Sequence, residues 1–136
     1  MGVLVSAPNF VINYENKHLE HLFTFKGHFI TPSDIDKTYE PLFTLLENLI
    51  SKKVENFTLV FEIGEHLGHS AISIFMKLFR ILIDYKKQTN ANVFISWYYT
   101  EEDDDNYYTG IDFNECFTDD LTINLIHKDN LDNINL

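Results

Sequence analysis

The chain has 136 residues, of which 45% are hydrophobic and 23% charged, a balance typical of one globular domain rather than a disordered chain. Its formal net charge of -11 argues against partners such as nucleic acid or an anionic membrane, which attract basic surfaces. No apolar run is long enough to span a membrane, and the first residues lack the pattern of a signal peptide. The single cysteine, Cys116, cannot form an intramolecular disulfide, so we expect a cytoplasmic protein.

A β-hairpin is predicted near the N-terminus. Residues 9–14 are rich in β-formers, and residues 15–17 have the composition of a turn. Residues 18–26 follow, with Phe23 and Phe25 on one face and polar side chains on the other. Gly27 is expected to close this second strand.

An amphipathic helix is predicted after the hairpin. Ser33, with Asp36 three residues later, has the spacing of a capping box. Apolar residues then recur at steps of three and four, and the pattern ends near Lys52 and Lys53, whose charges suit the carboxyl end of a helix. These apolar residues are Ile35, Tyr39, Leu42, Phe43, Leu46, Leu49 and Ile50.

The middle of the chain predicts a strand, a polar connection and a second helix. Apolar side chains alternate over residues 57–63, and the additional Val60 predicts that both faces of this strand are covered. The connection GEHLGHSAIS, residues 64–73, predicts a loop in which Ser70 or Ser73 caps the helix. The buried stripe comprises Ile72, Phe75, Met76, Phe79, Leu82 and Ile83, widened by Ile74, Leu78 and Ile81. So wide a stripe fits either a helix that contacts a partner or a densely packed small domain.

The last part of the chain predicts two strands around a short helix. Residues 93–99 form an interior strand, and the acidic residues 101–105 form a solvated loop. The helix is expected within residues 106–116 and the last strand at residues 122–127.

The predicted order is therefore β-β-α-β-α-β-α-β. Strands that alternate with helices indicate right-handed crossovers, so we expect an α/β fold with a mixed β-sheet and helices packed on it. Residues 1–128 form a single domain, and residues 129–136 form a C-terminal tail.

The polar connection contains the candidate chemistry. His66 and His69 have a His-x-x-His spacing near Glu62 and Glu65, which would suit a small metal-dependent enzyme. No third strong ligand is fixed by the sequence, so we favour solvated histidines and expect neither a metal nor another cofactor. Ser70 is either an unmodified cap or a phosphate acceptor at the amino end of a helix, where backbone amides and the helix dipole favour a phosphate. No nucleophile or nucleotide-binding motif is present, so we expect a protein that is not an enzyme.

Three blocks of sequence resemble a known family. The first is GHFITPSDIDKTYEPL, residues 27–42, and the second covers residues 59–75. The third is Trp97-Tyr98-Tyr99 followed by consecutive acids, then Gly110 and Phe113. Together they resemble the SiaC-like bacterial regulatory phosphoproteins, whose fold is similar to anti-sigma-factor antagonists and STAS domains.

The resemblance implies a switch at the start of the second helix. In the family, a dedicated kinase phosphorylates one hydroxyl there and a phosphatase releases it, and the unphosphorylated form binds a partner such as a diguanylate cyclase. Counting back from Trp97 without a gap places Ser70 on the acceptor. One extra residue in the helix-to-strand connection places His69 there instead, so a constitutive binding module without the switch remains the alternative. The expected partner-binding residues are His66, Leu67, Gly68, His69, Ser70, Ser73, Tyr99, Asp103 and Asp104.

Overall fold

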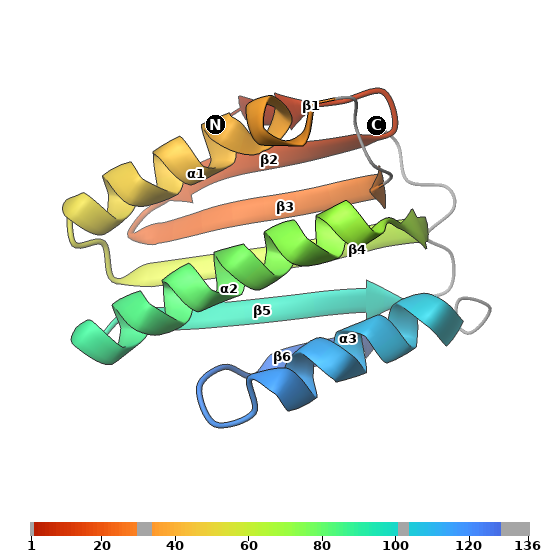
Figure 1. Cartoon of the computed structure of the whole chain (residues 1–136). Coiled ribbons are helices and arrows are strands. Elements are labelled where there is room, and N and C mark those ends of the chain that lie inside the picture. Colours follow the sequence, from red (N-terminus) through yellow and green to blue (C-terminus); the bar gives the residue numbers. More distant parts are fainter. Residues whose placement is uncertain (1, 30–33, 101–103, 129–136) are drawn as a thin grey trace.

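A sheet covered by helices forms the molecule in the computed structural model, which describes residues 2–29, 34–100 and 104–128, without the side chains of residues 65, 66 and 104 (Figure 1). In chain order, the elements are β1 (Gly2–Ser6), β2 (Phe10–Lys17), β3 (Glu20–Phe29), α1 (Ile35–Ser51), β4 (Asn56–Leu67), α2 (His69–Gln88), β5 (Asn92–Tyr99), α3 (Asp104–Cys116) and β6 (Ile123–His127). The mixed α/β fold and the order of its helices are confirmed, and the structure adds β1, which we did not predict.

The direction of the strands changes in the middle of the sheet. The strand order is β1-β2-β3-β4-β5-β6, so each strand lies beside the one that precedes it in the chain. β1, β2 and β3 are antiparallel neighbours, whereas β4, β5 and β6 each run parallel to the preceding strand. A helix connects each parallel pair, and crossovers of one hand between consecutive neighbours return on the same side. All three helices therefore lie on one face of the sheet (Figure 1).

The hairpin turn lies later than predicted. β2 continues to Lys17 and β3 begins at Glu20, so the turn is formed by His18 and Leu19 rather than by residues 15–17. His18 has a φ of 56°, the left-handed conformation that tight hairpin turns use. The prediction failed because residues 15–17 have turn-like polarity but pair regularly with β3.

Gly27 lies inside β3 and does not close it. Its φ of 118° is accessible to glycine and strained for any other residue. The register between β3 and β4 shifts after Gly27: Gly27 pairs with Ile63, but Phe29 pairs with Leu67. The end of β4 therefore contains extra residues opposite a short piece of β3, which is a β-bulge.

α1 is capped by Asp34. The Asp34 side chain accepts a hydrogen bond from the backbone amide of Lys37, with 3.1 Å between Oδ1 and N. The predicted cap, Ser33, lies outside the described residues, and the observed cap is its neighbour. Both residues are good N-caps, so the sequence alone did not distinguish them.

The core lies between the helices and one face of the sheet. Phe61, in the middle of β4, stacks on Phe25 and Trp97, with ring centroids 4.3 and 5.1 Å apart. Its ring also meets Phe75 of α2 edge-on at 5.0 Å. The side chains of β4 that enter this core alternate as predicted: Phe57, Leu59, Phe61 and Ile63.

α2 packs more densely than a narrow amphipathic helix. Its buried residues are Ala71, Phe75, Leu78, Phe79, Leu82, Ile83 and Tyr85. Ile72, Ile74, Met76 and Ile81 are half-buried at the margin of the core. This pattern agrees with a densely packed small domain, one of the two interpretations that the wide stripe left open.

The opposite face of the sheet has no helix on it in the part of the chain that the structure describes (Figure 1). Val60 is half-buried on that face, so the prediction that both faces of β4 are covered is wrong. A β-branched residue fits a strand whether or not its side chain is covered, which is why Val60 was a misleading signal.

Candidate regulatory site at the start of the second helix

The candidate site lies where three parallel strands end. β3, β4 and β5 point toward the same edge of the sheet, and α2 and α3 begin at that edge (Figure 1). In open α/β sheets, this edge is where binding sites form. The segment GEHLGHSAIS therefore lies at the functional edge of the fold.

This segment is mostly regular structure, not the predicted loop. β4 continues to Leu67, α2 begins at His69, and only Gly68 separates them. The backbone amide of Gly68 donates to the carbonyl of Phe29 at 2.7 Å, which fastens the junction to β3. The chain direction at the start of α2 is consequently fixed by the sheet.

Gly68 is the N-cap of α2, in place of the predicted Ser70 or Ser73. It has an extended backbone, with φ −74° and ψ 159°, and contributes no side-chain hydrogen bond to the first turn. Ser70 is the second residue of the helix and is half-buried, whereas Ser73 lies one turn later and is exposed. No acidic residue occupies the first turn. The amino end of α2 therefore has its dipole and first-turn amides without a carboxylate of its own.

A buried asparagine supports the end of β4. Asn106 of α3 is only 3% exposed, and its Nδ2 donates to the carbonyl oxygen of Ile63 at 3.2 Å. Its own backbone carbonyl accepts from the Trp97 indole at 3.1 Å. The pairing of β4 with β5 ends at Glu62, so Asn106 satisfies the next carbonyl where the ladder stops. α3, β5 and the segment before Ser70 are thereby joined.

Gly64 is required by the close approach of a side chain. A Cβ atom at this position would overlap the imidazole ring of His28 on β3. The backbone amide of His28 donates to the carbonyl of Asn9 at 2.8 Å, so the ring is carried by a fixed strand. This glycine therefore serves packing rather than turn formation.

The predicted contact residues divide into two groups. Leu67, Gly68, His69, Ser70 and Ser73 lie together at the β4–α2 junction, with His69 and Ser73 exposed. Their proximity follows directly from their neighbouring positions in the chain.

The other predicted residues are not assembled with that junction. The Tyr99 ring contacts Tyr107 of α3 and His127 of β6, at centroid distances of 4.6 and 5.6 Å. Tyr99 thus belongs to the α3–β6 side of the edge. Asp103 lies outside the described residues, and Asp104 begins α3. The acidic run is therefore partly helical, a correction to the predicted loop.

A metal centre is not formed by the residues that the structure describes. No group of three or more histidine, cysteine, aspartate or glutamate side chains is close enough to hold an ion among them. The side chains of Glu65 and His66, two members of the hypothetical clip, lie outside the description, so that hypothesis is untested.

A groove that we did not predict runs beside the site, between α1 and α2. This α1–α2 groove has a volume of about 330 Å³ and is lined by Asp36, Tyr39, Glu40, Phe43, Thr44, Glu47, Ile74 and Lys77. The Lys77 ammonium lies 4.4 Å from the centre of the Phe43 ring. Ile74 and Lys77 follow Ser70 at helical spacings of four and seven, so the groove continues from the side of α2 that carries Ser70.

Neither Asn106 nor the groove was identified from the sequence. Asn106 is a single polar residue after an acidic run, a context that resembles a solvated loop. The groove depends on how two helices lie side by side, which periodicity within each helix cannot show.

Comparison with known families supports a regulatory role. Residues 7–128 match the SiaC family, described as SiaC family regulatory phosphoprotein. Because this match covers most of the chain, the protein belongs to that family of regulatory phosphoproteins. Comparisons with curated proteins and with solved structures find no match. None of the helices in the described part of the chain is long and apolar enough to cross a membrane.

Proposed function

We propose that this protein is a non-enzymatic cytoplasmic signalling adaptor whose switch is phosphorylation of Ser70. A dedicated kinase adds the phosphate, a phosphatase removes it, and the unphosphorylated form binds and regulates a partner such as a diguanylate cyclase. The observation that carries this proposal is the position of Ser70 in the first turn of α2, behind a glycine cap that leaves the helix end without a side-chain bond. Membership of the family supports the regulatory role.

The amino end of α2 suits a phosphate on Ser70. The first-turn amides have no carbonyl acceptors within their own helix, and the positive end of the helix dipole attracts an anion. Interaction with the dipole contributes about 0.3–1 kcal/mol at an exposed site. Ser73 lacks this advantage because it lies one turn later, where backbone amides are already bonded within the helix. The geometry therefore favours Ser70 over Ser73 as the acceptor.

The neighbouring surface explains how the modification would alter binding. A phosphate adds about −1.5 to −2 charges near neutral pH. On Ser70 it would lie one helical turn from Ile74, at the mouth of the α1–α2 groove, which already contains the carboxylates of Asp36, Glu40 and Glu47. We expect a partner that docks across Ser70 and this groove to respond to the added charge.

Phosphate transfer is tested with purified protein, ATP and the kinase encoded by a neighbouring gene. Intact-mass measurement should show one added phosphate on the wild type and none on Ser70→Ala. Ser73→Ala is the matched control, because it removes a hydroxyl from the same helix one turn away, and it should be modified like the wild type. Phosphate that persists on Ser70→Ala refutes the assignment of the acceptor.

Partner affinity separates a working switch from a constitutive module. We expect Ser70→Asp to weaken binding of the captured partner by about tenfold or more, since 1.4 kcal/mol corresponds to a factor of ten. Ser73→Asp adds the same charge to an exposed position and should have a smaller effect. An equal affinity for wild type and Ser70→Asp would favour the constitutive module in which the switch is lost.

A further inference from the structure

The face of the sheet opposite the helices has an organised surface of its own. Strand pairing aligns its outward side chains in three rows that run across the strands. The middle row contains no charged residue: Val3, Asn13, Thr24, Val60, Ser96 and Asn124. We call this surface, with the two flanking rows described next, the open face. Its centre is flat and composed of small or β-branched uncharged side chains.

The first flanking row presents an exposed aromatic ring. It consists of Glu15, Leu22, Thr58 and Phe94, which are paired in that order across β2, β3, β4 and β5. Phe94 is 57% exposed, and Val3 of the middle row is 64% exposed. Large apolar side chains left exposed on the same face indicate a surface that another molecule covers.

The second flanking row balances its charges. Glu62 lies between Lys26 and Lys128, with nitrogen-to-oxygen distances of 3.5 Å to each. The Lys128 ammonium also lies 5.3 Å from the centre of the Tyr98 ring. Together with Glu15, these two lysines and two glutamates give no net charge, whereas the whole chain carries -11. The open face is thus a neutral area on a strongly acidic protein.

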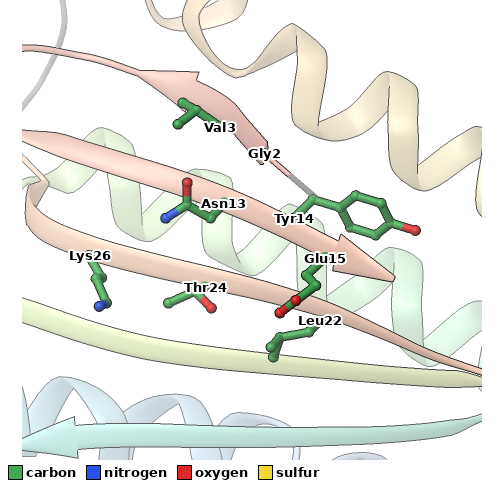
Figure 2. A pocket seen from close by; sticks show the side chains of 8 residues that line it. All are labelled: Gly2, Val3, Asn13, Tyr14, Glu15, Leu22, Thr24 and Lys26. Carbon is green, nitrogen blue, oxygen red and sulfur yellow. The ribbon is translucent and has the colours of Figure 1, made fainter. Parts of the chain in front are cut away.

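The open face also has a hollow at one side. It has a volume of about 370 Å³ and lies over β1, β2 and β3, where its lining includes Val3, Asn13, Leu22 and Thr24 (Figure 2). Gly2, on the edge strand, also lines the hollow and contributes no side chain to fill it. Phe94, on β5, lies on the opposite side of the sheet's midline. A projection and a hollow are therefore placed on either side of the centre.

We propose that a second copy of this chain packs on the open face, about a twofold axis that runs parallel to the strands between β3 and β4. Such an axis places β5 of one copy over β2 of the other and keeps each row at its own level. Phe94 then lies above the hollow beside Leu22 of the partner copy. Lys26 of each copy faces Glu62 of the other, since β3 and β4 exchange places. Both the shape and the charges are self-complementary in this one arrangement.

The rest of the surface explains why this face is selected. Two copies with a net charge of -11 each repel one another wherever their acidic surfaces meet. Contact through a neutral face minimises this repulsion, so we expect added salt to strengthen the dimer by screening the remaining charges. Six strands at a spacing of about 4.8 Å, each covered over about seven residues, give roughly 550 Å² of projected area per copy. Stable interfaces bury about 800 Å² per partner, so a dimer of micromolar strength is expected.

Light scattering coupled to size exclusion tests the dimer over loading concentrations of about 1–200 µM. The wild type should approach twice the chain mass of 16.0 kDa as concentration rises. Phe94→Asp should raise the dissociation constant by about 30-fold or more, because truncating a central aromatic anchor has effects of that size. Tyr108→Asp is the matched control: Tyr108 is 58% exposed on α3, away from the open face, and its replacement should leave the dimer intact. A wild type that stays monomeric throughout, or a Phe94→Asp variant that dimerises like it, overturns the proposal.

A charge exchange tests the twofold arrangement itself. Lys26→Glu gives copies with glutamate at both facing positions, and Glu62→Lys gives copies with lysine at both. Each variant alone should dimerise less than the wild type, whereas an equal mixture should form a heterodimer detected by native mass spectrometry. Absence of the heterodimer from the mixture, with both variants folded by circular dichroism, overturns the proposed pairing. Neither experiment depends on phosphorylation, so the outcome is independent of the proposed switch.

Discussion

Replacement of Asn106 by alanine should loosen the strand that leads to Ser70. The side-chain amide of Asn106 donates to the carbonyl of Ile63 inside the protein, where no water replaces it. Leaving a buried acceptor unsatisfied costs about 1–3 kcal/mol, so we expect Asn106→Ala to lower the free energy of unfolding by about 2 kcal/mol. For a domain of this size, that corresponds to a decrease in melting temperature of roughly 6 °C.

Urea denaturation and hydrogen exchange measure the two parts of this effect. The matched control is Asn92→Ala, which removes an exposed amide whose Nδ2 donates to Asn56 Oδ1 at 3.1 Å. Both partners there remain solvated, so the control should change stability by about 0.5 kcal/mol or less. In Asn106→Ala alone, amide exchange at residues 63–67 should accelerate more than exchange in β2. Equal losses of stability in the two variants would refute the role that we assign to Asn106.

Three further predictions follow from buried groups. The Tyr39 hydroxyl is buried without a hydrogen-bond partner among the described residues, so Tyr39→Phe should raise the free energy of unfolding by about 1 kcal/mol in urea titrations; destabilisation by that amount would contradict it. Burial lowers the pKa of His21, whose Nδ1 lies 2.6 Å from the Tyr14 hydroxyl. The unfolded chain therefore takes up a proton first, and stability should fall as the pH drops through about 6.5, less steeply in His21→Phe; parallel pH profiles would refute this. Gly64→Ala should destabilise by about 1–3 kcal/mol because its methyl group overlaps the His28 ring, and thermal melts should show partial rescue in the double variant with His28→Ala; strictly additive losses would contradict the overlap.

Local periodicity predicted the framework of the fold well. The alternation in β4 and the three-and-four spacing in α1 and α2 appear in the structure because burial on one side of each element produces both patterns. β1 was not predicted, since Val3, Leu4 and Val5 become a strand only through their pairing with β2. Such pairing is a property of the folded chain and leaves little trace in a short segment.

The candidate site was predicted less completely than the fold. The sequence placed Ser70 near the start of a helix, and the structure does so too, but the cap is Gly68 and the preceding residues belong to β4. Residues 64–67 have no apolar alternation, so their strand conformation reflects the bulge that lets Phe29 pair with Leu67. Asn106 acts from another helix, and its contact with Ile63 spans 43 positions in the chain. Contacts at such separations are absent from any local pattern.

The simple order of the strands has a consequence for how the protein is made. Because every strand pairs with its predecessor, the sheet can lengthen by one strand at a time as the chain leaves the ribosome. Each new strand covers the edge exposed by the previous one, and none has to wait for a partner that is synthesised much later. The segment around Ser70 acquires its support last, when β5 and α3 arrive and Asn106 reaches Ile63. We therefore expect the site to become a competent kinase substrate only when nearly the whole domain has folded.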